Sequence, residues 1–474
     1  MLATAKEILK EINSLGYEAY IVGGAVRDYV MQKPLHDIDI ATNTPLDVLK
    51  AHFHFVQDIS KNMNVGVYLI EKNGFKYEIA HFRSHAVSKN KETEQIYFVP
   101  TFKEDASQRD FTINAMGMDY LGNIIDYFGG REDIQNKVIR TAGCAFDRFG
   151  EDFIRILRAV RFAARYDFHL NASTADAISL CSACLLRLSP ERIQTELEKM
   201  AREGGKSFAK AIALMRELNI VRVILPELDI LFDLPHTDNH HPEGLCKNTA
   251  CENYIQYVKN HAFCKNCPNG FNSVGKHVLE TLRVCNSKEP YQLFALLFHD
   301  IGKGITYQLR EKNGALKHTY YRHDAVSEEL ITAIANRLKW SHKLTKITIF
   351  CAKNHMIVHE AMKLKPYTLL ALMENQYFPY LVETSYCDDK ARCELFKQEE
   401  WDILLAYLEE FRNTIFAFSQ YINGKRIMEV TGIQAGIRLG KILKAVKKHA
   451  ANHKIFDKEK LDKIIRFYEK CIKE

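Results

Sequence analysis

Two acidic side chains near the N-terminus have the spacing of a metal site. Asp37 and Asp39 lie in the run Asp-Ile-Asp-Ile, where polar and apolar residues alternate with the period of a β-strand. Both carboxylates then face one side, while Ile38 and Ile40 face the buried side. Glu78, on a second predicted strand, is a third carboxylate that can complete the set. Two Mg²⁺ ions held this way promote attack by a hydroxyl and neutralise a leaving pyrophosphate, so we predict these three carboxylates to be catalytic.

A glycine pair precedes the aspartates. The run Gly-Gly-Ala-Val-Arg-Asp at residues 23–28 follows a predicted strand and opens a helix. Glycines there allow a phosphate to approach the backbone and the helix N-terminus. Most glycine pairs are only turns, and this pair gains weight from the carboxylates that follow it.

The two motifs belong to a longer series that resembles one enzyme family. The series is similar to that of the class II tRNA nucleotidyltransferases, or CCA-adding enzymes, and of related bacterial poly(A) polymerases. It covers residues ~20–200 in the family's order: GGAVRD at 23–28, DIDIAT at 37–42, RDFTINAM at 109–116, DYFGG at 126–130, EDFIR at 151–155, LRAVRF at 157–162 and SPER at 189–192.

The resemblance implies template-independent addition of CCA to the 3′ end of tRNA from CTP and ATP, with Mg²⁺ held by Asp37 and Asp39. Arg109 offers a cation for phosphate and Asp110 an acceptor for a ribose hydroxyl. On a helix, Asp152 and Arg155 would share one face, so that one accepts and the other donates to the Watson–Crick edge of a base. The nucleotide-binding residues expected are Gly24, Arg27, Arg109, Asp110, Asn114, Asp152, Arg155, Arg158 and Arg161.

The head motifs leave the product open. An enzyme that adds only CC or only A, or a poly(A) polymerase, shares them. The family usually carries a second arginine where this chain has Gln108, which puts one phosphate contact in doubt. Residues 84–101 correspond to the family's flexible loop, which matters for the switch from C to A.

A second set of metal-ligating residues lies in the C-terminal half. The order His277, His299-Asp300 and Asp388 resembles the HD phosphohydrolase superfamily, whose sites use those four ligands. Imidazole and carboxylate together suit Mn²⁺, Fe²⁺, Ni²⁺ or Mg²⁺, and such sites hydrolyse phosphoesters. His323 and His355 are candidates for a second ion or for phosphate. A phosphohydrolase with an RNA-docking head is therefore the competing function, and a decayed HD site is the alternative.

Four cysteines between these two regions have approximate zinc-site spacing. Cys246, Cys251, Cys264 and Cys267 form two close pairs in a segment rich in His, Asn, Pro and Gly. They predict either a Zn²⁺ site, in which His240, His241 or His261 can replace one ligand, or free thiols in a loop. The pair Cys181 and Cys184 reads as helix packing.

Strand and helix patterns place these motifs in an α+β chain. Strand-like runs occur at residues 20–22, 37–40, 65–70 and 76–80, with a hairpin signal at 72–74, and helical spacing dominates from about residue 147. We predict a nucleotidyltransferase-type α/β head with a small β-sheet, an all-α neck, an HD-type helical body and an α-helical tail. The expected bounds are 1–140 for the head, 141–235 for the neck, 236–272 for the cysteine insert, 273–395 for the HD domain and 396–474 for the tail.

Composition agrees with a globular protein that binds a polyanion. Of 474 residues, 47% are hydrophobic and 26% charged, which excludes whole-chain disorder or coiled coil. Apolar runs fall far short of the ~20 residues that cross a bilayer, and the first residues have the pattern of an amphipathic helix. We therefore expect a cytoplasmic protein that does not associate with a membrane.

The formal charge of +6 resides in residues 441–474, which contain 11 Lys/Arg and 5 Asp/Glu. Glycines at 424, 436 and 440 resemble the tRNA-binding region of the Gram-positive family type, so we expect the tail to grip tRNA. The oligomeric state is not predicted.

Overall fold

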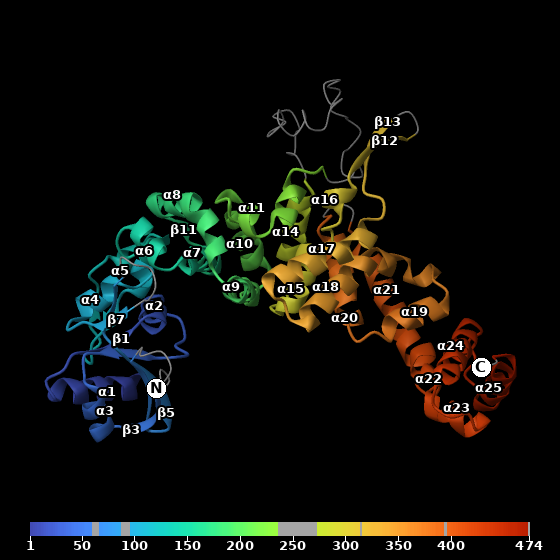
Figure 1. The fold of residues 1–474 in the computed structure, drawn as a ribbon, viewed down its shortest axis with the longest axis horizontal. Coiled ribbons are helices and arrows are strands. Elements are labelled where there is room, and N and C mark those ends of the chain that lie inside the picture. The colour runs from blue at the N-terminus through green and yellow to red at the C-terminus, as the bar shows by residue number, and fades with distance from the viewer. Residues whose placement is uncertain (59–65, 87–94, 236–272, 313–314, 393–395, 473–474) are drawn as a thin grey trace. The chain divides into compact units, whose positions relative to one another are not determined.

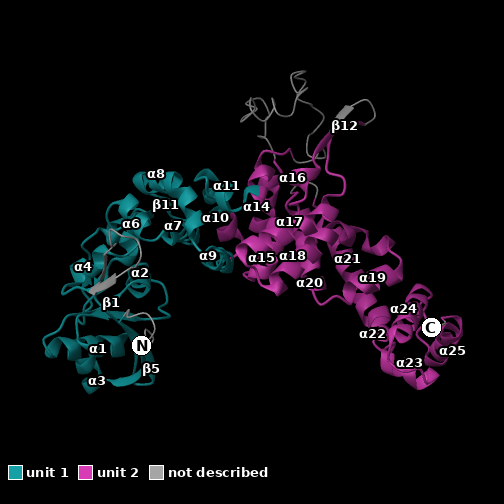
Figure 2. Cartoon of the chain, in the orientation of Figure 1, with its two compact units in different colours: residues 1–203, 210–226 teal, residues 204–209, 227–474 magenta. Residues whose placement is uncertain are grey.

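The computed structural model describes residues 1–58, 66–86, 95–235, 273–312, 315–392 and 396–472. The chain divides into two compact units, residues 1–203 with 210–226, and residues 204–209 with 227–474 (Figure 2). The predicted α+β class is confirmed, because the sheet lies in the first unit and helices dominate the rest (Figure 1). The five-segment division is finer than the two units and stays a prediction.

A seven-stranded mixed sheet forms the centre of the head. Its spatial order is β3-β4-β5-β2-β1-β8-β9. The predicted strands near 65–70 and 76–80 are β4 and β5, and Asn73 and Gly74 take positive φ values of 54° and 75° in the turn between them, as the hairpin signal requires. The strands are β1 (Ala19–Val22), β2 (Asp39–Thr42), β3 (His54–Asp58), β4 (Val67–Lys72), β5 (Phe75–His81), β8 (Gly117–Met118) and β9 (Ile124–Ile125).

Helices and a small hairpin complete the head. Helix α1 (Leu2–Ser14) buries Ala5, Ile8, Leu9 and Ile12, an apolar stripe at helical spacing, in the cluster that also contains the sheet's buried residues. Ile38 and Ile40 are buried in that cluster, as predicted. The other elements are α2 (Gly24–Val30), α3 (Leu46–His52), β6 (Arg83–Ala86), β7 (Gln95–Phe98), α4 (Phe102–Ser107), η1 (Thr112–Asn114) and α5 (Gly130–Gln135).

Residues 138–232 are mainly helical, with one short parallel strand pair. Helix α7 (Ile154–Tyr166) is buried along most of its length and packs on α9 (Pro190–Arg202), whose first residue is a proline, a residue favoured at that position. The remaining elements are β10 (Val138–Ile139), α6 (Ala145–Glu151), β11 (His169–Leu170), α8 (Ala172–Cys181), η2 (Ser182–Arg187), α10 (Gly205–Glu217), α11 (Ile220–Ile224), α12 (Pro226–Asp229) and η3 (Ile230–Phe232).

The second unit contains helical layers and one hairpin. Its body has α14 (Val274–Val284), α15 (Pro290–Phe298), α16 (Lys303–Thr306), β12 (Gln308–Lys312), β13 (Ala315–Thr319), α17 (His323–Leu338), α18 (His342–Asn354), η5 (His355–Lys363), α19 (Pro366–Met373) and α20 (Phe378–Lys390). The tail has α21 (Gln398–Phe411), a π-helical turn (Arg412–Phe416), α22 (Ala417–Ser419), α23 (Gly424–Thr431), α24 (Ile437–Asn452) and α25 (Lys458–Cys471). Ile427, Ile442, Val446 and Ile465 help form a separate small core for the last three helices.

Candidate functional site

Strand β1 ends at the glycine pair, which lies beside the carboxylates. Gly23 follows β1 and has φ of 68°, a conformation that other residues rarely adopt, and Gly24 begins α2. A Cβ placed on Gly23 would lie 3.5 Å from an Arg109 terminal nitrogen and 3.9 Å from an Asp39 carboxylate oxygen. The bare backbone therefore sits between a cation and an anion, which is the setting that the phosphates of a nucleotide and their counter-ion require.

Strand pairing places the Glu78 carboxylate beside Asp39. The parallel register of β2 and β5 places Asp39 opposite Glu78. Desolvation within the site, followed by the Glu78 carboxylate, raises the pKa of Asp39, while Arg109 acts in the opposite direction. Asp37 lies just before β2 rather than in it, so the predicted strand begins two residues later than expected. Asp37, Asp39 and Glu78 are not among the described trios whose ligand atoms all lie within 4.8 Å of one another.

Asp110 is the centre of a buried hydrogen-bond network. Its Oδ2 accepts from Arg158 Nε and Nη2 at 2.8 and 2.6 Å, and its Oδ1 accepts from the Asn114 amide and the Phe111 backbone N–H at 3.0 and 2.9 Å. Burial would raise the pKa of Asp110, but these donors hold it below its usual range. Arg27 Nη1 donates to Asn114 Oδ1 at 2.7 Å. The carboxylate predicted to sense ribose thus fixes the arginine beside it, and four donors already occupy it.

The two residues predicted to read the base, Asp152 and Arg155, are arranged differently from the prediction. Asp152 lies between α6 and α7 with extended backbone, where its Oδ1 accepts from Ile154 N–H, so it is not on one helix with Arg155. Its Oδ2 accepts from Arg192 of α9 at 2.7 Å. The expectation that Asp152 and Arg155 share a helix face is wrong, because the chain leaves the helix between them. Both side chains nevertheless line one cavity.

Arg155 is held from behind. Its Nη1 donates to Glu151 Oε2 at 2.7 Å and its Nη2 to the Gln108 backbone carbonyl at 3.0 Å. The other Glu151 oxygen pairs with Arg148 at 2.5 Å, and Arg148 also donates to the Ser107 carbonyl at 2.8 Å. Glu151, Arg148 and Arg155 are each about one-eighth exposed. We call these three residues the arginine clamp.

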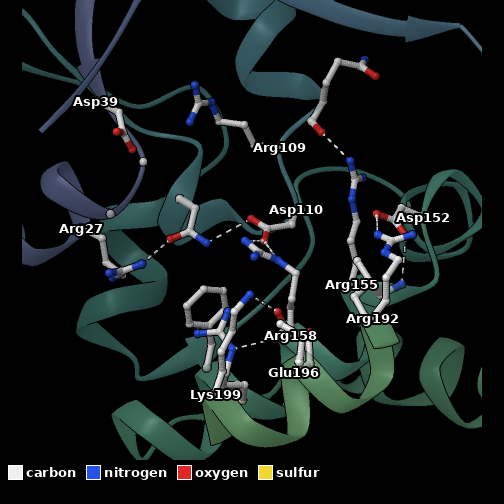
Figure 3. A pocket seen from close by; sticks show the side chains of 18 of the residues that line it. Arg27, Asp39, Arg109, Asp110, Asp152, Arg155, Arg158, Arg192, Glu196 and Lys199 are labelled. Atoms are coloured by element: carbon white, nitrogen blue, oxygen red, sulfur yellow. Dashed lines mark hydrogen bonds and ion pairs between the residues drawn. The ribbon is translucent and has the colours of Figure 1, made fainter. Parts of the chain in front are cut away.

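One open cavity of about 1200 Å³ collects these groups (Figure 3). Its lining includes Glu191 and Arg192 of the predicted SPER motif, and further along α9 it includes Glu196 and Lys199, which the sequence analysis did not name. There Glu196 accepts from Arg161 and Lys199, both at 2.8 Å, and Arg161 lies over the Phe162 ring. Arg192, Glu196 and Lys199 are spaced by four and three residues, so they lie on one face of the helix. This spacing was the signal available in the sequence. The predicted residues that line the cavity are Gly24, Arg27, Asp37, Asp39, Arg109, Asp110, Asn114, Asp152, Arg155, Arg158 and Arg161.

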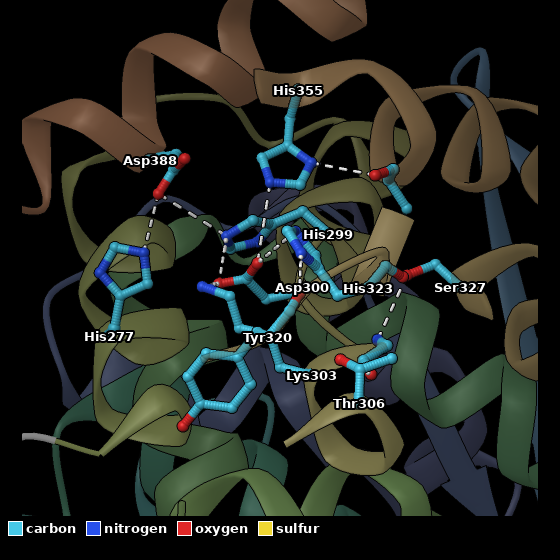
Figure 4. A network of polar contacts seen from close by, with 12 residues as sticks. His277, His299, Asp300, Lys303, Thr306, Tyr320, His323, Ser327, His355 and Asp388 are labelled. Atoms are coloured by element: carbon cyan, nitrogen blue, oxygen red, sulfur yellow. Dashed lines mark hydrogen bonds and ion pairs between the residues drawn. The ribbon is translucent and has the colours of Figure 1, made fainter. Parts of the chain in front are cut away.

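The four predicted HD ligands converge in the second unit (Figure 4). His277 Nε2 lies 2.8 Å from Asp388 Oδ1, and His299 Nε2 lies 3.8 Å from the same oxygen and 3.3 Å from Asp300 Oδ2. All four side chains are at most 3% exposed. They come from α14, the α15–α16 junction and α20, which is why residues more than 100 positions apart meet.

His323 and His355 reach the same centre. Their Nε2 atoms lie 3.6 and 3.7 Å from Asp300 Oδ1, which makes Asp300 common to two ligand groups. Within the described residues, His299 Nε2, Asp300 Oδ1 and His323 Nε2 are buried without a hydrogen-bond partner. Buried polar atoms without partners are costly, so a cation fits this donor set. Burial would raise the pKa of Asp300, but Lys303 and His299 hold it well below its usual range.

Two sequence predictions concern residues that the structure does not cover in full. Cys246, Cys251, Cys264 and Cys267, with His240, His241 and His261, lie outside the described residues, and so does the middle of the loop at 84–101. Cys181 and Cys184 are partly buried at the end of α8 and in η2, and both are free thiols.

Two segments of the chain match known protein families. Residues 19–140 match the family described as the Poly A polymerase head domain, and residues 167–231 match the probable RNA and SrmB-binding site of polymerase A. CCA-adding enzymes from Streptococcus pyogenes serotypes M3 and M12 are 42% identical over 212 residues, which is 44% of this chain. That match spans 52%, or about half, of the length of those relatives. The resemblance seen in the sequence is confirmed.

Solved structures extend the likeness of fold to nearly the whole chain. The Bacillus stearothermophilus CCA-adding enzyme in complex with CTP matches with a TM-score of 0.64 and 24% identity, covering 98% of both chains. The Thermotoga maritima CCA-adding enzyme complexed with tRNA_CCA matches with a TM-score of 0.56 and 19% identity, covering 98% of this chain and 94% of the other. No described helix is both long and apolar enough to span a membrane.

Proposed function

We propose that this chain is a template-independent tRNA nucleotidyltransferase that builds the 3′-terminal CCA of tRNA from CTP and ATP. The observation that carries the proposal is the single cavity in which glycine backbone, carboxylates, a ribose-facing network and Asp152 with Arg155 line one space. A nucleoside triphosphate needs groups that bind its phosphates, its metal ion, its ribose and its base. The cavity lining supplies one group of each kind without a nucleic-acid template. The enzymes that share the fold and the head motifs support the same activity.

The residues around Gly23 divide the work on the triphosphate. Arg109 is anchored to Asp105 through Nε and Nη2 at 3.1 and 2.9 Å and offers Nη1 to phosphate, and Gly24 at the start of α2 offers a backbone N–H. Asp37 and Asp39 would hold Mg²⁺, with Glu78 beside them, and oxygen ligands of this kind suit that ion. Bound there, Mg²⁺ neutralises the departing pyrophosphate and promotes attack by the tRNA 3′ hydroxyl. Burial, and then the neighbouring Glu78 carboxylate, raise the pKa of Asp39, and a bound cation would offset both effects, which supports this role.

Base choice follows from the hydrogen-bond pattern of the Watson–Crick edge. Cytosine and adenine both present an amino group where uracil and guanine present a carbonyl oxygen. A carboxylate such as Asp152 can accept from the amino group, and Arg155 can donate to the adjacent ring nitrogen. Arg158, fixed by Asp110, lines the same cavity. The pair therefore selects C and A over U and G without a nucleic-acid template.

The test uses purified chain, Mg²⁺ and a tRNA transcript that lacks its last three nucleotides. CTP alone should extend it by two nucleotides, and CTP with ATP by three. An arrest at two with both nucleotides indicates a CC-adding enzyme, growth only of a CC-ended transcript indicates an A-adding enzyme, and a long ATP ladder indicates a poly(A) polymerase. Asp39→Ala should abolish incorporation, and surviving incorporation refutes the assignment of the head.

A second candidate function rests on the buried His/Asp centre. We propose that His277, His299, Asp300 and Asp388 hold one divalent ion, and that Asp300 with His323 and His355 can hold another, of Mn²⁺, Fe²⁺, Ni²⁺ or Mg²⁺ type. Such ions supply phosphoester hydrolysis, and Lys303, 2.6 Å from Asp300, adds a cation for the phosphate. Assaying phosphomonoesters and cyclic phosphodiesters with each metal, against Asp300→Ala, tests this activity. No turnover with any metal refutes it.

A further inference from the structure

A separate cluster of two cysteines and a glutamate lies near the His/Asp centre and shares helix α20 with it. Cys285 and Cys387 are buried, and Glu383 is half-buried between them. The ligand atoms of the three residues all lie within 4.8 Å of one another, and both thiols donate to Glu383 Oε1. The cluster joins the end of α14, where Cys285 is the residue after the last helical turn, to the middle of α20.

The distances match the edges of a tetrahedral site. The Glu383 Oε1 atom lies 3.6 Å from Cys387 Sγ and 3.9 Å from Cys285 Sγ. Zinc bonds of about 2.3 Å to sulfur and 2.0 Å to oxygen place such ligands about 3.5 Å apart in a tetrahedron. Glu383 and Cys387 are four residues apart on one helix, the spacing that turns two ligands to one ion in helical metal motifs. Only small side-chain movements separate this arrangement from coordination.

The charge of the cluster also points to a cation. Among the residues that the structure describes, Glu383 has no ion pair with a lysine, arginine or histidine, and both of its hydrogen bonds come from thiols. A partly buried carboxylate with only weak donors lacks compensation, whereas a divalent ion would compensate it. The partial exposure of Glu383 leaves one side open, so a solvent molecule can take a fourth position.

We propose that Cys285, Glu383 and Cys387 form a zinc-type metal site that ties α14 to α20. Two thiolates and one carboxylate favour Zn²⁺ over the harder ions suited to the His/Asp centre. The same two helices supply His277 and Asp388, which face each other at 2.8 Å. The ion would therefore fix the spacing of the helices that hold the neighbouring centre, and this role does not depend on the proposed nucleotidyltransferase activity.

The experiment uses Co²⁺ as the probe on the full-length chain in which Cys246, Cys251, Cys264 and Cys267 are replaced by serine. Thiolate ligands give Co²⁺ an intense near-ultraviolet charge-transfer band, which nitrogen and oxygen ligands of the His/Asp centre do not. The band should appear, and it should be lost in added Cys285→Ser or Cys387→Ser. Glu383→Gln should weaken Co²⁺ binding at least about tenfold. Cys351→Ser, a buried cysteine outside the cluster, is the matched control and should keep the band.

NMR of Cd²⁺ bound to the unmutated chain is a second test, and it does not depend on whether the variants fold. A resonance typical of two thiolates with oxygen ligands, distinct from any four-thiolate signal, is expected. The proposal is overturned if that resonance is absent, if the cobalt band survives Cys387→Ser, or if peptide mapping of freshly purified protein shows a disulfide between Cys285 and Cys387.

Discussion

The arginine clamp offers a sharp test of base selection. Glu151→Gln removes the one charge that Arg148 and Arg155 share, while it keeps the size of the side chain. Arg155 would retain its bonds to two backbone carbonyls, but it would lose the carboxylate contact at 2.7 Å. We expect the Arg155 guanidinium to become mobile, so that it donates equally poorly to correct and incorrect bases.

The size of the effect follows from the burial of the clamp. All three side chains are only 12–13% exposed, so solvent screens their charges weakly. A hydrogen bond to a charged group contributes about 1.5–3 kcal/mol in such a setting. Because each 1.4 kcal/mol corresponds to a factor of ten, the preference for CTP over UTP should fall about 10- to 100-fold. The loss should appear in the ratio of kcat/KM values, since both nucleotides use the same metals.

The assay is single-turnover incorporation of C or U into a tRNA transcript that lacks its last three nucleotides. Glu198→Gln is the matched control, because its carboxylate contacts Gln194 at 3.0 Å and Arg202 at 3.9 Å and is not part of the cavity lining, and it should leave the ratio unchanged. Thermal unfolding verifies that each variant is folded. A folded Glu151→Gln enzyme with the wild-type CTP preference would refute the idea that the clamp orients Arg155.

Three further predictions concern other parts of the molecule. Burial would raise the pKa of Glu196, but Arg161 and Lys199 lower it. The ionised form of Glu196 therefore stabilises the fold fully above the unfolded pKa of about 4.3. This stability is lost as the pH falls through the lower pKa of the folded state. Arg161→Met should therefore destabilise the chain by about 3 kcal/mol at pH 7 and by less at pH 4 in urea unfolding, and an equal loss at both pH values would contradict this. Asp300→Asn should leave nucleotide incorporation within about twofold of wild type while it weakens Mn²⁺ binding at least about tenfold, and a parallel loss of incorporation would show that the two sites are not independent. Lys441, Lys444 and Lys448 lie exposed on α24, so changing all three to Gln should reduce the slope of log Kd for tRNA against log salt by about 2, and an unchanged slope would place the tRNA elsewhere.

Much of the head could be predicted because its signals are local. The alternation around Ile38 and Ile40 indicated a half-buried strand, and Asn73-Gly74 indicated the hairpin turn, since both depend on neighbours a few residues away. The aspartates and the glycine pair were identified by type and spacing alone. The residues of the HD set could be named from their order, although their distances could not.

Other features depended on contacts between segments far apart in the sequence. The pairing of Asp152 with Arg192 rather than with Arg155 arises because the chain leaves the helix at Asp152 and α9 packs against α7. The arginine clamp, and the occupation of all acceptor positions of Asp110, likewise depend on packing. The sequence pattern does not indicate which of several arginines will pair with a given carboxylate, because the pairing depends on which helices pack closely together.

The sequence by itself determined the chemistry available to this protein: oxygen ligands near a glycine turn, a carboxylate and an arginine predicted to read a base, and histidine and aspartate ligands in the order of a metal centre. Residue type and short spacing carry that information, since side-chain chemistry and local backbone preference are properties of the chain. Only the tertiary structure decided which groups meet. It placed Asp39 beside Glu78 through strand register, made Asp300 common to two ligand groups, and brought Cys285 to Glu383 and Cys387 across 98 and 102 positions of sequence. Helix packing and strand pairing fix those distances, because burial of the apolar faces leaves the polar groups between them one set of neighbours.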